Sequence, residues 1–268
     1  MAYSNFSKVN SFEKFVGIVY TCWVGFWFVI IFVGLFPIYW VALQKEKWKP
    51  FAHQLNRIWG KILFLIIGMK VEVDYQFMPD KKGTYVFVSN HFSYWDIATL
   101  GVIIDNYYAF VGKSSVKKIP LLGYMFTKLH IQVDRSEKGS RAISMTRAMK
   151  ALKKNRSMMM FAEGGIVTRN PPQMAKAFKE GAFLMAIQNQ VPIVPITLLN
   201  NHQIIWDEDL IMKRLPVKAI VHKPISTIGM KTSNMDELKE KTWNTIQNEL
   251  NRYHGIDLEV ELEKNSKI

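Results

Sequence analysis

Cysteine is almost absent from this sequence of 268 residues, which contains Cys22 alone. An internal disulfide and a zinc site built on paired cysteines are therefore excluded. The six histidines form no His-Glu-x-x-His pattern, so no metal ion is expected. No Gly-x-Ser-x-Gly elbow occurs, which removes the nucleophile of an α/β-hydrolase. A P-loop is also excluded, because Tyr107 stands where its first glycine is required.

Acidic residues are scarce relative to basic ones, with 22 Asp and Glu against 35 Lys and Arg. Most of the excess lies in residues 112–156, which contain twelve basic residues and only two acidic ones, Asp134 and Glu137. Lys150, Lys153, Lys154 and Arg156 fit a solvated helix face. Nucleic-acid binding is not expected, because no nucleic-acid motif accompanies the charge. The pattern favours attraction to anionic lipid headgroups or to a phosphorylated substrate.

Charge is missing altogether from residues 15–44. A helix needs about 20 apolar residues to cross a bilayer, so this segment is long enough to span, or to break near Pro37 and turn back. Lys and Arg are denser after the segment than before it, which predicts that the rest of the chain lies on the cytosolic face. The use of a single cysteine agrees with that compartment.

Residues 51–69 mix apolar side chains with His53, Arg57 and Lys61. This pattern is typical of an amphipathic helix lying on a bilayer, and equally of a core helix of a globular domain. Both interpretations stay open on the residues alone.

Apolar runs alternate with helical patterns over the remainder of the chain. This alternation predicts an α/β domain at residues 70–255, with a mixed, largely parallel sheet, preceded by N-terminal membrane helices in residues 1–69. A polar tail follows at 256–268. The expected strands are 71–75, 85–89, 107–111, 130–133, 157–161, 193–198 and 217–221, and the expected helices include 120–129, 140–154, 174–189 and 234–253.

His91 and Asp96 follow the expected strand at 85–89. In an α/β sheet, ligand sites form at the carboxyl ends of strands. A histidine with an aspartate close by in sequence is typical of a general base and the group that orients it. Since no enzyme nucleophile accompanies this pair, the substrate itself is expected to supply the attacking oxygen.

Four blocks in a fixed order carry a resemblance to a known family. Residues 90–96 resemble the His-x-x-x-x-Asp motif of glycerolipid acyltransferases. The second block is matched by 112–123 together with 131–135, the third by 161–165, and the fourth by 191–196. Over residues 85–198 the sequence therefore resembles the 1-acylglycerol-3-phosphate acyltransferase family.

This resemblance implies transfer of a fatty acyl group from an acyl thioester to the free hydroxyl of lysophosphatidic acid, giving phosphatidic acid in phospholipid biosynthesis. His91 would be the general base and Asp96 its orienting partner. No cofactor is implied, and the co-substrate is acyl-CoA or an acylated acyl carrier protein. Two alternatives remain. The acceptor is instead glycerol 3-phosphate, another lysophospholipid or a lyso-aminolipid, or the protein is an inactive membrane-binding adaptor.

The resemblance also implies a set of substrate-binding residues. Arg135 matches the arginine of the second block, with Lys113 as a supporting cation, and Glu163, Gly164 and Gly165 belong to the third block. The third block departs from the family pattern, because Gly165 stands where threonine and then arginine are usual. The arginine is either absent or displaced to Arg169, which leaves open which cation meets the phosphate.

Members of the family carry an N-terminal pair of helices that hold the catalytic domain against one leaflet. The resemblance therefore favours the membrane interpretation of residues 51–69. It predicts a membrane protein with its catalytic domain on the cytosolic face, in contact with membrane lipids and a lysophospholipid acceptor.

Overall fold

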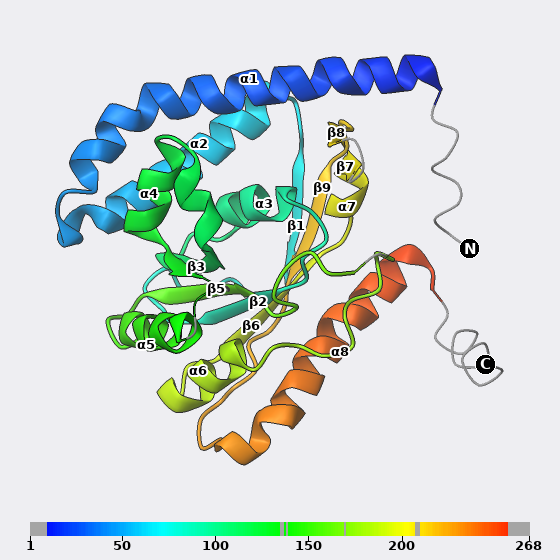
Figure 1. Ribbon diagram of the computed structural model, residues 1–268. Coiled ribbons are helices and arrows are strands. Elements are labelled where there is room, and N and C mark those ends of the chain that lie inside the picture. The colour runs from blue at the N-terminus through cyan, green and yellow to red at the C-terminus, as the bar shows by residue number, and fades with distance from the viewer. Residues whose placement is uncertain (1–9, 135–136, 138, 169, 207–209, 257–268) are drawn as a thin grey trace.

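The computed structural model describes residues 10–134, 137, 139–168, 170–206 and 210–256. Its centre is a seven-stranded sheet in the order β1-β9-β6-β2-β5-β3-β4, with helices on both faces (Figure 1). A two-stranded sheet, β7-β8, lies apart from it. The strands are β1 (Val71–Tyr75), β2 (Val86–Ser89), β3 (Tyr108–Lys113), β4 (Ile131–Val133), β5 (Ser157–Phe161), β6 (Ile193–Leu198), β7 (Ile205–Trp206), β8 (Ile211–Met212) and β9 (Val217–Val221).

Five neighbouring strands of the large sheet are parallel: β6, β2, β5, β3 and β4. β9 runs antiparallel to β6, and β1 runs parallel to β9. The prediction of an α/β fold with a mixed, largely parallel sheet is therefore confirmed. All four residues of β2 are buried, as expected for a strand with parallel neighbours on both sides. The five parallel strands end at one common edge.

Two helical layers cover the large sheet. α3 (Trp95–Ile103) packs on one face, where Leu100 and Ile103 contact Phe87 of β2 in a shared apolar cluster. The opposite face carries Val86 and Val88 and packs against three other helices. These are α5 (Ser140–Leu152), α6 (Gly181–Asn189) and α8 (Met235–His254). The alternation along β2 follows from the period of two in a strand.

α6 is shorter than the sequence predicts, because residues 174–180 are not helical. Their backbone N–H groups are bound elsewhere: Met174 donates to Gln247 Oε1, Ala175 to Glu163 Oε2, and Lys179 to the carbonyl of Ala162. In a helix that began at 174, the N–H of Lys179 would bind the carbonyl of Ala175, but here it binds Ala162 instead, so this helical turn is not closed. The helix over 174–189 is therefore wrong in its first half.

α1 (Ser11–Ala42) is one continuous helix with Pro37 inside it, so the alternative of a break near Pro37 is not found. Among the described residues it is the one helix long and apolar enough to cross a membrane. It lies lengthwise along the domain beside α2 (Lys49–Ile66), at the top of Figure 1. Its buried residues form one stripe, Gly17, Val24, Phe32, Tyr39 and Ala42. Its outer face is apolar and exposed, including Phe15, Val19, Trp23, Phe26, Val29, Ile30 and Val33.

α2 has two apolar faces. Leu55, Trp59, Leu63 and Phe64 are buried in the clusters that join it to α1, α3 and α4 (Leu122–Leu129). The other side of the helix exposes Phe51, Ile58, Ile62 and Leu65. The buried face agrees with the core-helix interpretation of residues 51–69, and the bilayer interpretation of the exposed face stays a prediction. The remaining short helices are η2 (Glu46–Trp48), η3 (Ser114–Lys118), α7 (Asn201–Ile204) and η4 (Thr232–Asn234).

His222, at the end of β9, gives the fold a dependence on pH that can be measured. It is buried between Thr197 Oγ1, at 2.7 Å from Nε2, and Gln76 Oε1, at 3.2 Å from Nδ1. Burial lowers the pKa of its imidazole from 6.5 to about 4. The unfolded chain therefore binds this proton at higher pH than the folded chain, so His222 lowers the free energy of unfolding as pH falls from about 6.5 to about 4.

We expect His222→Gln to flatten this part of the stability profile. The difference between the two proteins should change by on the order of 3 kcal/mol between pH 7 and pH 4. Urea unfolding at several pH values measures it. The other histidines are common to both proteins and cancel in the comparison. Parallel profiles for the two proteins would contradict the assignment.

Candidate active site

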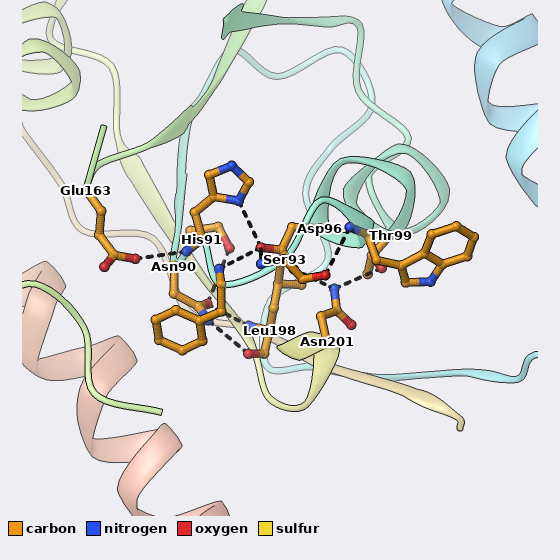
Figure 2. Close-up of polar contacts among 11 residues, drawn as sticks. Asn90, His91, Ser93, Asp96, Thr99, Glu163, Leu198 and Asn201 are labelled. Carbon is orange, nitrogen blue, oxygen red and sulfur yellow. Dashed lines mark hydrogen bonds and ion pairs between the residues drawn. The ribbon is translucent and has the colours of Figure 1, made fainter. Parts of the chain in front are cut away.

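The residues that follow β2, β5 and β6 meet at the carboxyl edge of the sheet (Figure 2). Asn90 joins the end of β2 to the end of β6. Its Nδ2 donates to the carbonyl of Leu198 at 2.9 Å, and its Oδ1 accepts from the Leu198 N–H at 2.8 Å. This side chain continues the hydrogen bonding between β2 and β6 by one step, and it fixes the point at which the chain leaves the sheet toward His91.

His91 and Asp96 are in direct contact. His91 Nδ1 lies 2.9 Å from Asp96 Oδ2. The imidazole stacks on Phe161 at the end of β5, with ring centroids 3.8 Å apart and planes 11° apart. His91 is 8% exposed, so the ring is confined but reachable. Its Nε2 has no hydrogen bond to any residue within the described ranges.

Asp96 is held from several directions. Its Oδ2 also accepts the N–H of Phe92 at 2.9 Å and of Ser93 at 3.0 Å, and its Oδ1 accepts Nδ2 of Asn201 at 2.9 Å. The position is in the first turn of α3, where the helix dipole favours a carboxylate. Because a carboxylate can only accept, the proton between the two residues belongs on His91 Nδ1, and Nε2 carries the lone pair.

Glu163 follows β5 and supports His91 through the backbone. Its Oε1 accepts the N–H of His91, and its Oε2 accepts the N–H of Ala175, each at 2.9 Å. Burial raises the pKa of the Glu163 carboxyl above its ordinary value, and the two amide bonds act in the opposite direction. Glu163 thus ties the His91 loop to residues 174–180.

Gly164 follows Glu163, and the side chain of Lys179 lies over it. Its φ is +83°, a conformation that side chains disfavour. A Cβ at this position would lie 3.2 Å from Cγ of Lys179. The Gly164 N–H donates to the carbonyl of Phe161 at 3.0 Å, which closes the turn after β5. The next residue, Gly165, also has positive φ.

The predicted cations are only partly placed. Lys113 is the exposed last residue of β3, which is separated from β2 by β5 alone. With strands about 4.8 Å apart, the ends of β2 and β3 are about 10 Å from each other. Arg135 and Arg169 lie outside the described residues. The structure therefore brings His91, Asp96, Glu163 and Gly164 together and puts Lys113 at the same edge.

Asn201 and Phe161 were not identified from the sequence as parts of the site. Asn201 also donates to Thr99 Oγ1 at 3.0 Å, so it joins the end of β6 to α3. The sequence does contain a signal for Asn201, because Asn200 and Asn201 closely follow a buried strand that ends at the same edge. Phe161 is the first residue of the third block, but it was not singled out because an aromatic residue within a strand is ordinarily part of the core. The described residues contain no group of three or more His, Cys, Asp or Glu side chains that could hold a metal ion.

Residues 70–199 match the family model described as Acyltransferase. The chain is 30% identical over 187 residues to the chloroplast 1-acyl-sn-glycerol-3-phosphate acyltransferase BAT2 of Brassica napus, covering 69% of this chain and 53% of that protein. It is 29% identical over 187 residues to the Saccharomyces cerevisiae 1-acyl-sn-glycerol-3-phosphate acyltransferase, covering 69% of this chain and 61% of that protein. The chain spans about half the length of the first two curated relatives it matches.

The fold is also that of a solved structure. The crystal structure of the 1-acyl-sn-glycerophosphate (LPA) acyltransferase PlsC from Thermotoga maritima superposes with a TM-score of 0.72 at 18% sequence identity, covering 90% of this chain and 96% of that one. The matched region 70–199 contains His91, Asp96 and Glu163 in the geometry described above. Residues 70–199 of the chain therefore carry an acyltransferase domain.

Proposed function

We propose that this protein transfers a fatty acyl group from an acyl thioester to the free hydroxyl of lysophosphatidic acid, making phosphatidic acid for phospholipid biosynthesis. The observation that carries the proposal is His91, with Nδ1 bound to Asp96 and Nε2 directed to no other described residue, at the carboxyl edge of a parallel sheet. The names of the Brassica napus and Saccharomyces cerevisiae relatives support this acceptor. The donor is acyl-CoA or an acylated acyl carrier protein, and no cofactor takes part.

The reaction requires one base and no enzyme nucleophile. The acceptor hydroxyl donates its hydrogen bond to His91 Nε2, and its oxygen attacks the thioester carbonyl carbon as the proton moves to that nitrogen. The carbon–sulfur bond then breaks, and the thiolate takes the proton from the imidazolium. Asp96 stabilises the positive charge on the ring. An ester and a free thiol result, and His91 returns to its starting state.

Glu163 and Phe161 have positioning roles in this scheme. The stacking of the imidazole on Phe161 opposes rotation of the ring away from the acceptor, and the bond from the His91 N–H to Glu163 fixes the backbone that carries the ring. Both carboxylate oxygens of Glu163 accept backbone N–H groups, which leaves its negative charge compensated beside a phosphorylated substrate.

Lys179 is proposed as the cation that the third block lacks at Gly165. Its side chain crosses Gly164, next to the residue that binds the His91 backbone, and its own N–H is fixed to the carbonyl of Ala162 at 2.7 Å. A lysine here reaches the acceptor phosphate from the β5 side, while Lys113 approaches from the β3 side. Arg135 and Arg169 remain candidates on the sequence pattern.

Membrane attachment is proposed to be parallel to the bilayer surface. α1 is about 48 Å long, but it contacts the domain along most of this length. Met212 N–H donates to Thr21 Oγ1 at 2.8 Å, the rings of Phe32 and Trp59 are 4.8 Å apart, and Gln44 Nε2 donates to Tyr124 at 3.1 Å. A bilayer core is about 30 Å thick, so crossing would bury parts of the domain as well. The exposed apolar faces of α1 and α2 instead enter one leaflet, on the cytosolic side.

An acceptor panel tests the proposed reaction. The purified full-length chain is assayed in detergent with lysophosphatidic acid, glycerol 3-phosphate, lysophosphatidylcholine and a lyso-aminolipid, each with acyl-CoA and with acylated acyl carrier protein. We expect lysophosphatidic acid to give the highest kcat/KM with one donor or both. A higher kcat/KM for another acceptor would identify that acceptor as the substrate in place of lysophosphatidic acid. No transfer to any acceptor would refute the enzyme function.

Replacing the base should remove transfer and leave the fold intact. We expect His91→Ala to lower kcat by about 10²–10⁴ and Asp96→Asn by a similar factor, because the second change favours the wrong imidazole tautomer. Turnover is measured with saturating acceptor, and melting temperature checks folding. A folded His91→Ala protein with near-normal turnover would rule out His91 as the base.

Replacing Lys179 should chiefly weaken binding of the acceptor. Loss of a charged hydrogen bond to phosphate costs about 1.5–3 kcal/mol, so Lys179→Gln should raise the acceptor KM by roughly 10- to 100-fold with a smaller change in kcat. Lys176→Gln is the matched control, since Lys176 is also exposed and lies in the same irregular segment. Equal KM changes in the two variants would show that Lys179 has no specific contact with the phosphate.

A further inference from the structure

The segment between β3 and α4 has features that acyl transfer does not require. It consists of η3 and residues 119–121, and is called here the η3–α4 loop. We propose that this loop is a third membrane contact, which inserts its apolar tip, Ile119 and Leu121, into a lipid surface with anionic headgroups. The proposal rests on the parallel membrane attachment of α1 and α2 proposed above.

The tip of the loop is strained and apolar. Leu121 has φ +59° and ψ −52°, and the N–H of Leu122 donates to the carbonyl of Pro120 at 2.5 Å across it. Such a one-residue turn is rare for a residue with a side chain, and backbone strain of this kind gathers at functional sites. Leu121 is 40% exposed and Ile119 is 49% exposed. The strained turn therefore holds two large apolar side chains partly in solvent.

The loop is built as a tight, fixed unit. The N–H of Gly123 donates to the carbonyl of Ile119 at 2.7 Å. A Cβ at Gly123 would lie 2.3 Å from the carbonyl oxygen of Lys117, so only glycine permits this close return of the chain. The tip is thus displayed by a defined backbone.

The tip lies next to the proposed membrane face. Directly after it, Leu122 and Tyr124 of α4 pack against the C-terminal half of α1. The Tyr124 ring is 6.2 Å from that of Phe36, and its hydroxyl accepts from Gln44 Nε2 at 3.1 Å. Figure 1 shows α4 close beneath α1 and α2. The loop therefore lies close in the chain to a helix that packs against the C-terminal half of α1.

The charges around the tip match an anionic bilayer. Lys117 and Lys118 directly precede Ile119, and both are exposed. Residues 112–133 contain no Asp or Glu. Lysines at a bilayer surface are attracted by the negative potential of anionic lipids, while neighbouring apolar residues enter the interface. An acidic protein partner would also suit the lysines, but the exposed apolar tip and the packing of α4 against α1 favour lipid.

The position of the loop has a consequence for the active site. η3 begins directly after Lys113, at the carboxyl edge that carries His91. Insertion of the tip would hold this edge at the level of the headgroups. A lipid acceptor could then reach His91 with its phosphate still near the bilayer surface.

Fluorescence quenching at single cysteines tests the proposal. Cys22→Ser removes the one native thiol from the full-length chain. Leu121→Cys is then labelled with an environment-sensitive fluorophore, and the protein is reconstituted onto vesicles of phosphatidylcholine and phosphatidylglycerol with brominated acyl chains. Leu65→Cys on the outer face of α2, 81% exposed, reports the membrane attachment itself, and Ile228→Cys, 82% exposed and remote from α1, is the control. We expect quenching at 121 and at 65, and none at 228.

The outcomes separate the two proposals. No quenching at 65 would overturn the membrane attachment of α1 and α2. Quenching at 65 without quenching at 121 would overturn the loop contact alone. If an added acidic acyl carrier protein changed the fluorescence of the label at 121, and brominated lipid did not quench it, the partner of the loop would be a protein and not lipid.

A charge variant tests the preference for anionic lipid. In the labelled Leu121→Cys protein, Lys117→Gln with Lys118→Gln should lower the ratio of inserted to free tip by about 30-fold on vesicles with phosphatidylglycerol. Lys223→Gln with Lys241→Gln is the matched control, since both lysines are exposed and distant from the loop. If quenching were equal with and without phosphatidylglycerol, and replacing Lys117 and Lys118 had no effect, the proposed preference of the loop for anionic lipid would be overturned.

Discussion

The carboxylate of Asp96 is the contact on which the rest of the site depends. It binds the His91 ring, two backbone N–H groups of the intervening loop, and the amide of Asn201. These partners come from the end of β2 and the end of β6, and Asp96 itself lies in the first turn of α3. One buried group therefore fixes the tautomer of the base and joins three elements, so replacing it disturbs chemistry and geometry together.

The N-terminal helices support the same site from behind. Trp95, next to Asp96, packs against Phe64 of α2 with ring centroids 5.2 Å apart. α2 in turn packs against α1 through Trp59, which contacts Phe28 and Phe32. α1 and α2, whose outer faces are proposed to enter the bilayer, are thus connected to the catalytic pair through these aromatic contacts. The helices that would hold the enzyme at its lipid substrate also help to form the first turn of α3.

Much of the fold and the central pair could be predicted from the sequence. Buried parallel strands are continuous apolar runs, and polar residues directly after them mark the functional edge, which is how His91 and Asp96 were found. Glu163 was identified through the family resemblance of the third block. Contacts between distant segments could not be predicted. Residues 174–180 have helical periodicity, but the N–H of Lys179 binds the carbonyl of Ala162 in place of a helical partner. The role of Glu163 as a backbone acceptor, and the course of α1 along the domain, likewise depend on tertiary packing.

The central claim is that His91 Nε2 removes the proton of a lipid hydroxyl whose phosphate is held on the β5 and β3 side of the same edge. The most direct test is a crystal structure of the full-length chain with lysophosphatidic acid and no acyl donor. The account predicts the acceptor hydroxyl within about 3.2 Å of His91 Nε2 and the phosphate beside Lys179 or Lys113. A bound acceptor with its hydroxyl turned away from His91, or with its phosphate on the β6 side, would contradict it.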